Sequence, residues 1–386
     1  MRVLIYPHAL PSHVYPMTPL IWALRLAGHE VLACCPPNVL DVLHGAGADT
    51  VPLASDFDPM ALATGLLPTG LLPVEVWGAA DDERWRSSSP MTVERGRKVV
   101  AESLEMAQAW RPDLIITDPL EVAGRIVAGR LKVPYVRHRW GIDPITDVFD
   151  PSVDQLLAGQ LSDLGLDELP EPVATTDVCP PSLQVPGVPA GLAMRYVPFN
   201  GAGTVPVWAM RRTAARRLCV TMGTALPEFR GAQLLLRRIL RAAAEIDDLE
   251  VVIAATTVDP VLLDEFSCLI AGAGRAPLTA LLGSCDAVVH HGGSGSTITT
   301  TRFGLPHVVT PQWGDQFACA KRIRALGVGV ALDTAASQRG QDAIDLAIRT
   351  VVEDQAPRTA ARALAEEAAA LPTPAQIVTE LAELAR

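Results

Sequence analysis

The sequence is short of positive charge. Its 386 residues carry 32 Lys and Arg against 43 Asp and Glu, which gives a formal net charge of -11. A protein that holds a nucleic acid by counterion release needs a basic surface or stripe. The nearest basic group, Arg211, Arg212, Arg216 and Arg217, precedes an apolar run and is typical of a solvated linker. We therefore expect no nucleic acid partner.

Cysteines are few and follow no pattern. The seven cysteines are scattered without a C-x-x-C pair, so a reducing cytoplasm is the simplest setting. No leader-like segment precedes the strand-like start at residues 1–5, and no apolar run reaches the ~18–20 residues that a membrane span needs. These absences predict a cytoplasmic protein without an integral membrane segment.

The signatures of several other enzyme classes are missing. No G-x-G-x-x-G follows the first strand of either half, which weakens a dehydrogenase reading, and no G-x-S-x-G elbow of a serine hydrolase occurs. Asp56-Phe57-Asp58 is a D-x-D sequence, but no apolar strand precedes it, so it reads as a solvated loop. We expect neither a bound metal nor a cofactor.

The chain has two halves that begin alike. Each starts with a β-rich run, a loop, an amphipathic segment and a second β-rich run, which is a βαβ unit. Such units predict an α/β fold of two doubly wound domains with parallel sheets, facing each other across a cleft. The units are expected at residues 2–6, 16–27 and 30–35 and at residues 217–222, 232–244 and 250–254.

A stretch rich in Pro and Gly separates the halves and places a linker near residues 200–215. We expect domains at residues 1–205 and 206–371, with a last helix at residues 372–386. Residues 55–90 are irregular, and long loops are usually functional or disordered. Because Trp77 and Trp85 argue against disorder, we predict a binding loop there.

The strongest local signal is a small-residue turn at residues 287–297. An apolar strand ends in His290 and His291, glycines follow, and the next segment can be helical. Glycines let backbone N–H groups approach a diphosphate, and a helix N-terminus favours negative charge. No lysine follows the last glycine, so this is not a Walker loop. On spacing alone, a plain strand-to-helix turn remains an equal alternative.

Residues 277–329 resemble the nucleotide-sugar signature of GT-B family 1 glycosyltransferases. Runs at residues 11–16, 138–144 and 179–183 look most like the antibiotic deoxysugar transferases of aromatic polyketide pathways. The resemblance implies a GT-B fold of two Rossmann-like domains, with the last helix packing back on the first. The matching pieces are Pro277-Leu278, Leu281-Leu282, Cys285-Asp286-Ala287, residues 291–297, Gly304-Leu305-Pro306, residues 311–316 and residues 325–329.

The resemblance assigns the donor site to the second half. It places His291 and Ser296 on the diphosphate and Pro277 with Leu278 against the base. Many relatives carry a Trp two residues before that proline; here Arg275 stands there, and its guanidinium can still stack. The other expected donor-binding residues are Thr224, Gly293, Ser294, Gly295, Thr299, Trp313, Asp315 and Gln316.

Five of these have particular expected roles. Asp315 and Gln316 resemble the pair of residues that holds sugar hydroxyls in the family. Trp313 is expected to form one wall of the sugar site. Thr224 closes the site from the loop after the strand at residues 217–222. Relatives that use uridine diphosphate usually carry an acid at the position of Thr299, where it binds ribose hydroxyls. A deoxyribose has no 2′-OH for that acid, so Thr299 favours a thymidine diphosphate sugar, although neutral drift at this position is the alternative.

A transferase of this kind needs a base for the acceptor proton, and histidine suits because its pKa lies near neutrality. His13 lies in the loop after the first strand, where a doubly wound sheet places its ligands, and it matches the family's base. His8 is the local rival. Asp118 ends the strand at residues 114–117 and could orient the imidazole, or cap a helix before Pro119, or do both.

For the acceptor we expect an aromatic pocket lined by Trp77, Trp85 and Trp140, all placed in loops. The sequence predicts an inverting glycosyltransferase that moves a deoxysugar from a thymidine diphosphate to an aromatic polyketide-type aglycone. The alternatives are a nucleotide-sugar epimerase, a lipid-acceptor transferase and a non-catalytic activator that binds sugar nucleotide. A homodimer and a helper protein remain open.

Overall fold

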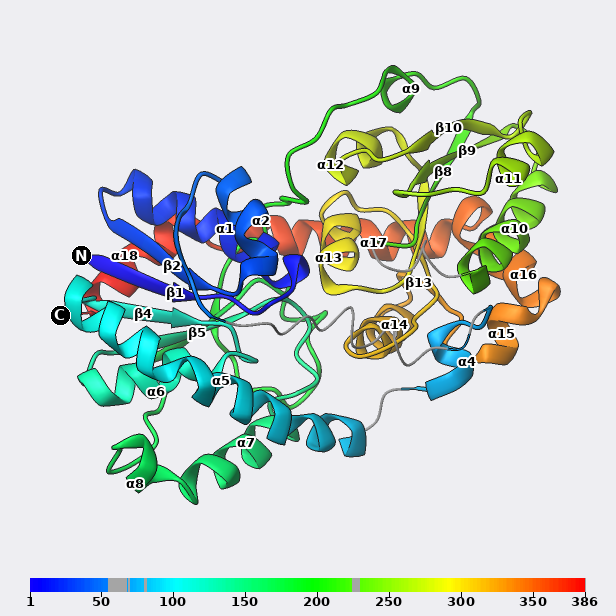
Figure 1. Cartoon of the computed structure of the whole chain (residues 1–386). Coiled ribbons are helices and arrows are strands. Elements are labelled where there is room, and N and C mark those ends of the chain that lie inside the picture. The colour runs from blue at the N-terminus through cyan, green and yellow to red at the C-terminus, as the bar shows by residue number, and fades with distance from the viewer. Residues whose placement is uncertain (55–67, 69, 80–81, 224–229, 386) are drawn as a thin grey trace. The chain divides into compact units, whose positions relative to one another are not determined.

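The computed structural model describes residues 1–54, 68, 70–79, 82–223 and 230–385. The chain forms two compact units (Figure 1). Unit 1 comprises residues 1–59, 81–201 and 371–386, and unit 2 comprises residues 60–80 and 202–370. Both units are α/β with parallel sheets, which confirms the predicted fold class.

Unit 1 is built on a seven-stranded sheet in the order β3-β2-β1-β4-β5-β6-β7, and its strands pair in parallel. The order reverses between β1 and β4, which makes their carboxyl ends the switch point where such sheets bind ligands. The strands are β1 (Arg2–Tyr6), β2 (Glu30–Cys35), β3 (Asp49–Pro52), β4 (Leu114–Thr117), β5 (Tyr135–Arg139), β6 (Ala174–Asp177) and β7 (Leu192–Ala193).

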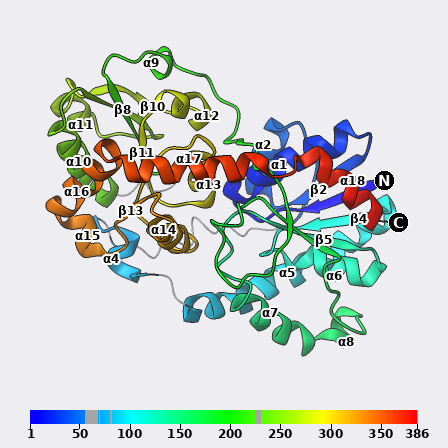
Figure 2. The same ribbon diagram turned by 180° about the vertical axis from the view of Figure 1, so that it is seen from behind.

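Helices cover both faces of this sheet, so its central strands are apolar on both sides. Figures 1 and 2 show α18, the last helix, beside α1, and the two are in contact. The helices of unit 1 are α1 (Pro11–Leu26), η1 (Pro37–Val39), α2 (Leu40–Gly45), α5 (Asp82–Trp110), α6 (Val122–Leu131), α7 (Phe149–Ala158), α8 (Leu161–Leu164) and α18 (Pro374–Leu384).

Helix α1 begins five residues earlier than the sequence predicts. Two prolines suit a first helical turn, and the structure uses Pro11 rather than Pro16, which lies inside the helix. A proline at the first position loses no hydrogen bond because that N–H has no helical partner. His13 is therefore held by a helix and not by a loop.

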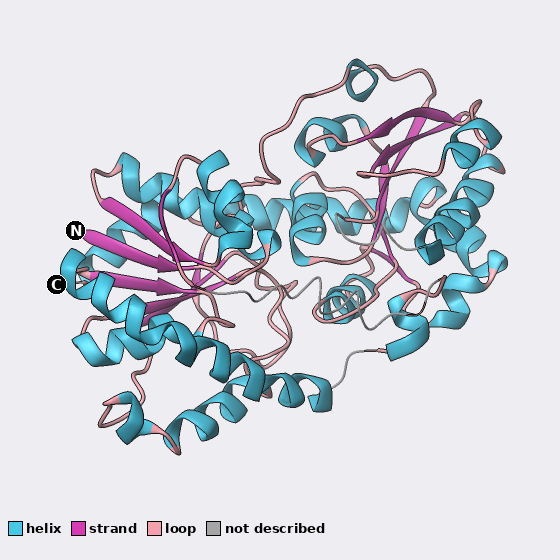
Figure 3. Ribbon diagram, viewed as in Figure 1, coloured by secondary structure: helices cyan, strands magenta, loops and turns pink. Residues whose placement is uncertain are grey.

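Unit 2 repeats the design with a six-stranded parallel sheet in the order β10-β9-β8-β11-β12-β13 (Figure 3). Here the order reverses between β8 and β11. Alternate residues of β8 and β9 enter two separate hydrophobic clusters, one on each face. The strands are β8 (Arg216–Thr221), β9 (Leu249–Ala254), β10 (Ile270–Gly274), β11 (Ala287–His290), β12 (His307–Val309) and β13 (Gly329–Ala331).

One short helix of unit 2, α4 (Pro73–Trp77), comes from the first half of the chain. The expected loop at residues 55–90 thus contains α4 and the start of α5, and Trp77 and Trp85 lie in helices. The remaining helices are α9 (Val207–Met210), α10 (Arg230–Ala244), α11 (Pro260–Glu265), α12 (Leu278–Leu281), η3 (Leu282–Ser284), α13 (Ser294–Arg302), α14 (Gln316–Ala325), α15 (Ala335–Arg339), α16 (Gln341–Glu353) and α17 (Gln355–Ala370).

The basic stripe at residues 211–217 is not wholly a solvated linker. Arg217 belongs to β8 and is fully buried, where its Nε donates to Glu250 Oε1 at 2.5 Å. A buried guanidinium needs such a partner because an unpaired buried charge is costly. Among the helices that the structure describes, none has both the length and the apolar character that crossing a bilayer requires.

Candidate active site

In unit 1, His13 and Asp118 meet at the switch point of the sheet. His13 lies in the first turn of α1, the helix that follows β1, and Asp118 directly follows β4. The two strands pair in register, with Tyr6 opposite Thr117. The imidazole Nδ1 and the carboxylate Oδ2 are 2.8 Å apart, and both side chains are buried. The sheet topology therefore brings together two residues 105 positions apart.

The contacts of Asp118 define the state of the imidazole. Its second oxygen, Oδ1, accepts the backbone N–H of Leu120 at 2.9 Å, so both oxygens are held. The helix that follows, α6, begins only at Val122, and Asp118 caps the turn before it rather than the helix itself. A carboxylate can only accept a hydrogen bond, so Nδ1 carries the hydrogen and donates it to Asp118, and the Nε2 lone pair of His13 is left able to take a proton from a substrate.

The neighbouring His8 is arranged differently. Its ring lies 5.0 Å from that of His13, and Nη2 of the buried Arg95 lies 3.2 Å from its Nδ1. A guanidinium can only donate, so the lone pair of His8 is already engaged. Burial lowers the pKa of His8 well below its usual range, and the charge of Arg95 lowers it further. This geometry favours His13 over His8 as the base.

Of the three tryptophans expected around the acceptor, Trp140 contacts His13. Its ring centroid lies 4.4 Å from that of His13, with the planes 30° apart. The preceding Arg139 is buried and donates to Asp143 at 2.7 Å and to Asp177 at 3.0 Å, which fixes the loop that carries Trp140. Trp85 packs instead against the core of unit 1. Trp77 belongs to unit 2.

In unit 2, the glycine turn joins β11 to α13 as the sequence predicts. Gly292 has φ +87°, and a Cβ there would lie 2.8 Å from Val309 Cγ1 and 3.0 Å from the Gln316 carbonyl oxygen. Glycine is therefore required at this position. Gly293 is the N-cap residue of α13, so backbone N–H groups at the start of α13 can donate hydrogen bonds to an anion there.

The imidazole of His291 lies between two glycines of this turn region. A Cβ on Gly223, which follows β8, would lie 2.8 Å from His291 Cε1, and one on Gly293 would lie 2.5 Å from Nε2. The Nδ1 atom is buried and has no hydrogen-bond partner among the described residues. Burial lowers the pKa of His291 to about 4, although the charge of Asp315 opposes the shift. The ring is therefore neutral near pH 7.

The loop before α14 and the first residue of that helix contain the expected sugar-binding residues. The hydroxyl of Ser294 donates to Asp315 Oδ2 at 2.8 Å, which ties this loop to the start of α13. Gln316 is buried, and its Oε1 accepts the backbone N–H of Gln312 at 2.8 Å. Trp313 packs partly against the core of unit 2. Asp315 and Gln316 thus help to shape the loop itself.

The remaining expected donor residues differ in exposure. Arg275 is exposed after β10, and Pro277 is the N-cap of α12. Leu278 packs into a core cluster of unit 2, and Thr299 is fully buried within α13. Gly295 and Ser296 are half-buried in the first turn of α13. Thr224 lies outside the described residues.

The sequence did not indicate that the side chain of His290 helps to hold the glycine turn in place. Gly292 donates its N–H to His290 Nδ1 at 3.0 Å, so Nδ1 is the acceptor and Nε2 carries the proton. That Nε2 lies 2.8 Å from Nδ1 of His307, at the start of β12. Burial lowers the pKa of His290 well below its usual range and that of His307 to about 3. The pair is therefore neutral and fixes the turn to the neighbouring strand.

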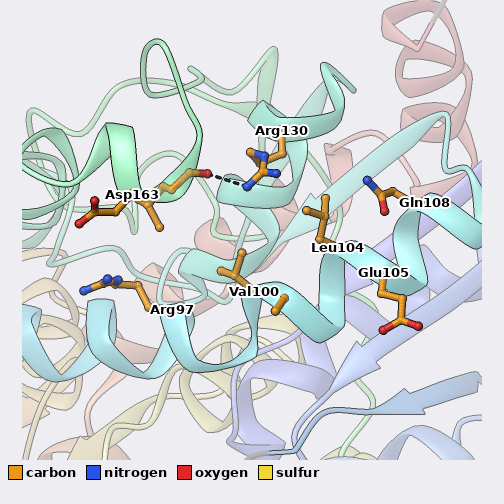
Figure 4. Close-up of a pocket in the computed structure, with 9 residues that line it drawn as sticks. Arg97, Val100, Leu104, Glu105, Gln108, Arg130 and Asp163 are labelled. Carbon is orange, nitrogen blue, oxygen red and sulfur yellow. Dashed lines mark hydrogen bonds between the residues drawn. The ribbon is translucent and has the colours of Figure 1, made fainter.

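A surface hollow of about 440 Å³ lies elsewhere in unit 1, beside α5 and α8. Figure 4 shows Arg97, Leu104 and Arg130 along it, with Arg130 donating to the Leu164 carbonyl oxygen at 2.9 Å. It shares no residue with the His13 and Asp118 pair. In the part of the chain that the structure describes, no three His, Cys, Asp or Glu side chains gather as metal ligands would.

Two family models match the chain. The N-terminal domain of the erythromycin biosynthesis protein CIII-like family matches residues 22–223, and the C-terminal domain of the same family matches residues 237–384. The L-demethylnoviosyl transferase of Streptomyces niveus is 36% identical over 385 residues, which are 99% of this chain and 98% of that protein.

Solved structures resemble the chain over its whole length. The spinosyn rhamnosyltransferase SpnG complexed with thymidine diphosphate has a TM-score of 0.84 and 34% identity, covering 99% of this chain and 100% of that one. The glycosyltransferase SsfS6 of Streptomyces sp. SF2575, also complexed with thymidine diphosphate, has a TM-score of 0.80 and 30% identity, covering 99% of each chain.

Proposed function

Since this chain belongs to the erythromycin biosynthesis CIII-like family of glycosyltransferases, we propose that it moves a deoxysugar from thymidine diphosphate to an aromatic polyketide-type acceptor, with inversion. That it is a glycosyltransferase of natural-product pathways follows from its family. The observation that carries the finer proposal is the 2.8 Å contact between His13 Nδ1 and Asp118 Oδ2.

The proposed reaction begins at Nε2 of His13. This nitrogen takes the proton of an acceptor hydroxyl while the hydroxyl oxygen attacks the anomeric carbon of the sugar. Asp118 orients the ring and stabilises the imidazolium that forms. A single displacement of this kind inverts the configuration at the anomeric carbon. The bond between that carbon and the diphosphate oxygen breaks, and the diphosphate leaves with its electron pair.

The departing diphosphate is held in unit 2. The N-terminus of α13 offers backbone N–H groups and favourable partial charge, and the neutral His291 offers one ring N–H. Thr299 in place of an acid supports a deoxyribose rather than a ribose. SpnG and SsfS6, whose structures contain thymidine diphosphate, support the same donor class.

The position of Trp140 is the argument for a planar acceptor. Its indole lies against the ring of the proposed base, so an aromatic acceptor stacked near it would place a hydroxyl within reach of Nε2. The fixed loop at residues 139–146 keeps the indole in place, because Asp143 also accepts the N–H groups of Ile145 and Thr146, each at 3.0 Å.

The proposal is tested by an assay of sugar transfer. Purified protein is incubated with a thymidine diphosphate deoxysugar and a panel of polyphenolic polyketides and macrocyclic lactones. Mass spectrometry detects the product, and NMR reads its anomeric configuration. We expect a glycosylated polyphenol with inverted configuration. Transfer to macrocyclic lactones alone would contradict the acceptor, retention would contradict the single displacement, and free sugar nucleotide epimer as product would favour the epimerase alternative.

A further inference from the structure

Helix α4 is packed into unit 2 although the chain reaches it from unit 1. Leu72 and Val74 are buried in the main hydrophobic cluster of unit 2. The fit to α10 is close, because a Cβ on Gly231 would lie 2.9 Å from the backbone of Leu71 and Leu72. An ion pair between Glu75 and Arg339 of α15 also holds the helix, and Figure 1 shows α4 beside α15.

Gln312 connects α4 to the loop that precedes α14. Its Oε1 accepts the backbone N–H of Val74 at 3.4 Å. Its Nε2 donates to the Thr310 carbonyl oxygen at 3.0 Å and to Gln338 Oε1 at 2.7 Å. Both amide hydrogens and the carbonyl oxygen of this buried side chain are thus engaged.

The partner Gln338 carries the connection further. It lies in α15, is fully buried, and donates through Nε2 to the carbonyl oxygens of Pro311 at 3.0 Å and Leu332 at 2.8 Å. Each amide in this network therefore has a fixed orientation, set by backbone groups that can only accept. Breaking one member leaves other buried polar groups without partners.

The network contacts both ends of the segment that carries Trp313 and Asp315, through Thr310 and Pro311 on one side and Gln316 on the other. Gln316 Oε1 accepts the N–H of Gln312, so the same residue is held through its backbone and its side chain. We propose that Gln312 is a positioning residue, and that α4 docked on Gln312 and Arg339 holds residues 310–316 in the shape that receives the sugar of the donor. The inference rests on the proposed function, which places the sugar at this loop.

Two variants test the proposal. Arg339→Glu sets a like charge beside Glu75, and the Arg339 side chain is exposed enough to tolerate the change. Gln312→Met keeps the volume and removes the hydrogen bonds. Arg241→Glu is the matched control, because Arg241 is a comparably exposed arginine of unit 2 that also faces a glutamate, Glu265.

The first measurement separates effects on binding of the sugar from effects on binding of the nucleotide. We expect either variant to raise the KM for a thymidine diphosphate sugar about tenfold, while the Kd for free thymidine diphosphate changes less than about twofold. The double variant should lose little more than one single variant, because both act through one network. A KM no higher than that of the Arg241→Glu control, or a parallel loss of thymidine diphosphate binding, would overturn the proposal.

The second measurement does not depend on the donor. Hydrogen exchange followed by mass spectrometry should show faster exchange in residues 72–77 and in residues 310–316 for both variants, by about tenfold. Unchanged exchange at residues 310–316 would refute the link between α4 and the loop. Wild-type protein that bound no thymidine diphosphate would instead refute the proposed function, while the exchange result would still decide whether α4 holds the loop.

Discussion

The imidazole of His291 lies so close to Gly293 that a methyl group on the glycine would stand 2.5 Å from Nε2. The ring therefore occupies the space that any other residue would fill. We predict that Gly293→Ala displaces the ring and weakens thymidine diphosphate binding about as much as His291→Ala does. The expected loss for each is about 1.5–3 kcal/mol, because a neutral ring N–H that donates to an anionic diphosphate still makes a charge-assisted hydrogen bond.

Isothermal titration calorimetry with thymidine diphosphate measures this loss. Gly45→Ala is the control, since a Cβ there meets nothing within 4 Å and the backbone is not left-handed. A loss that shrank as the pH rose from about 6 to about 8 would show that a protonated His291 makes the contact, which would contradict the neutral ring. Unchanged affinity in both variants would mean that the phosphate site lies elsewhere.

The His290 and His307 pair predicts a pH dependence of stability. The folded state keeps His307 neutral, with its pKa lowered from 6.5 to about 3, whereas the unfolded chain takes up the proton near its usual value. The unfolded state thus binds more protons below about pH 6.5, so the free energy of unfolding should fall as the pH is lowered through that range.

Urea unfolding between about pH 7.5 and about pH 5 measures that slope. His307→Gln keeps an acceptor for His290 Nε2 and removes the titration, so its slope should be shallower. His44→Gln changes an exposed histidine and should leave the slope as it is. Equal slopes in wild-type protein and His307→Gln would show that the buried pair does not govern acid stability.

His13→Ala should lower the turnover rate about 10²–10⁴-fold, which is the usual contribution of a general base, and leave donor affinity nearly unchanged. Asp118→Asn should cost less if the carboxylate only orients the ring through its 2.8 Å contact. The double variant should lose little beyond His13→Ala. Steady-state kinetics on an alcohol acceptor, with thymidine diphosphate affinity alongside, measures these effects; near-normal turnover of His13→Ala would refute the assignment.

Wild-type protein should bind thymidine diphosphate about tenfold more tightly than uridine diphosphate, since Thr299 offers no acid to a 2′-OH. Deoxyuridine diphosphate separates the two causes of such a preference. If the sugar ring decides, it should bind like thymidine diphosphate; if the base methyl group decides, it should bind like uridine diphosphate. Equal binding of all three would contradict the donor argument from Thr299.

Turnover should persist in the presence of a chelator. The reason is the N-terminus of α13. It offers N–H groups and positive partial charge to the diphosphate, where other transferases use a metal. Rates are compared with and without EDTA, and then with added magnesium or manganese. Activity that the chelator abolished and a divalent metal restored would contradict metal-independent transfer.

The βαβ units were predictable because each shows an apolar run, a segment able to be helical and a second apolar run in that order. The contact between His13 and Asp118 was predictable for a related reason. Both follow such runs, and parallel topology places adjacent strand ends together. The turn at Gly292 and Gly293 was also visible in the sequence, because its glycines and the following helix form a recognisable pattern.

The parts that the sequence did not show depend on long-range packing. Nothing local tells which of Pro11 and Pro16 begins α1, since both suit a first turn. In the sequence, Arg217 looks like one member of a basic stripe. Only the structure shows that its side chain pairs with Glu250. The role of Gln312 depends on Val74, which is 238 positions away. Spacing carries no information on contacts of that kind.

Because residues 60–80 belong to unit 2, neither unit is one continuous length of chain. An enzyme chimaera joined once, near residue 201, would pair the second half of one parent with the α4 of another. Leu72, Val74 and Glu75 would then meet a cluster and an arginine that evolved with a different segment. Exchange of donor preference between relatives should therefore succeed more often when residues 60–80 are transplanted together with residues 202–370.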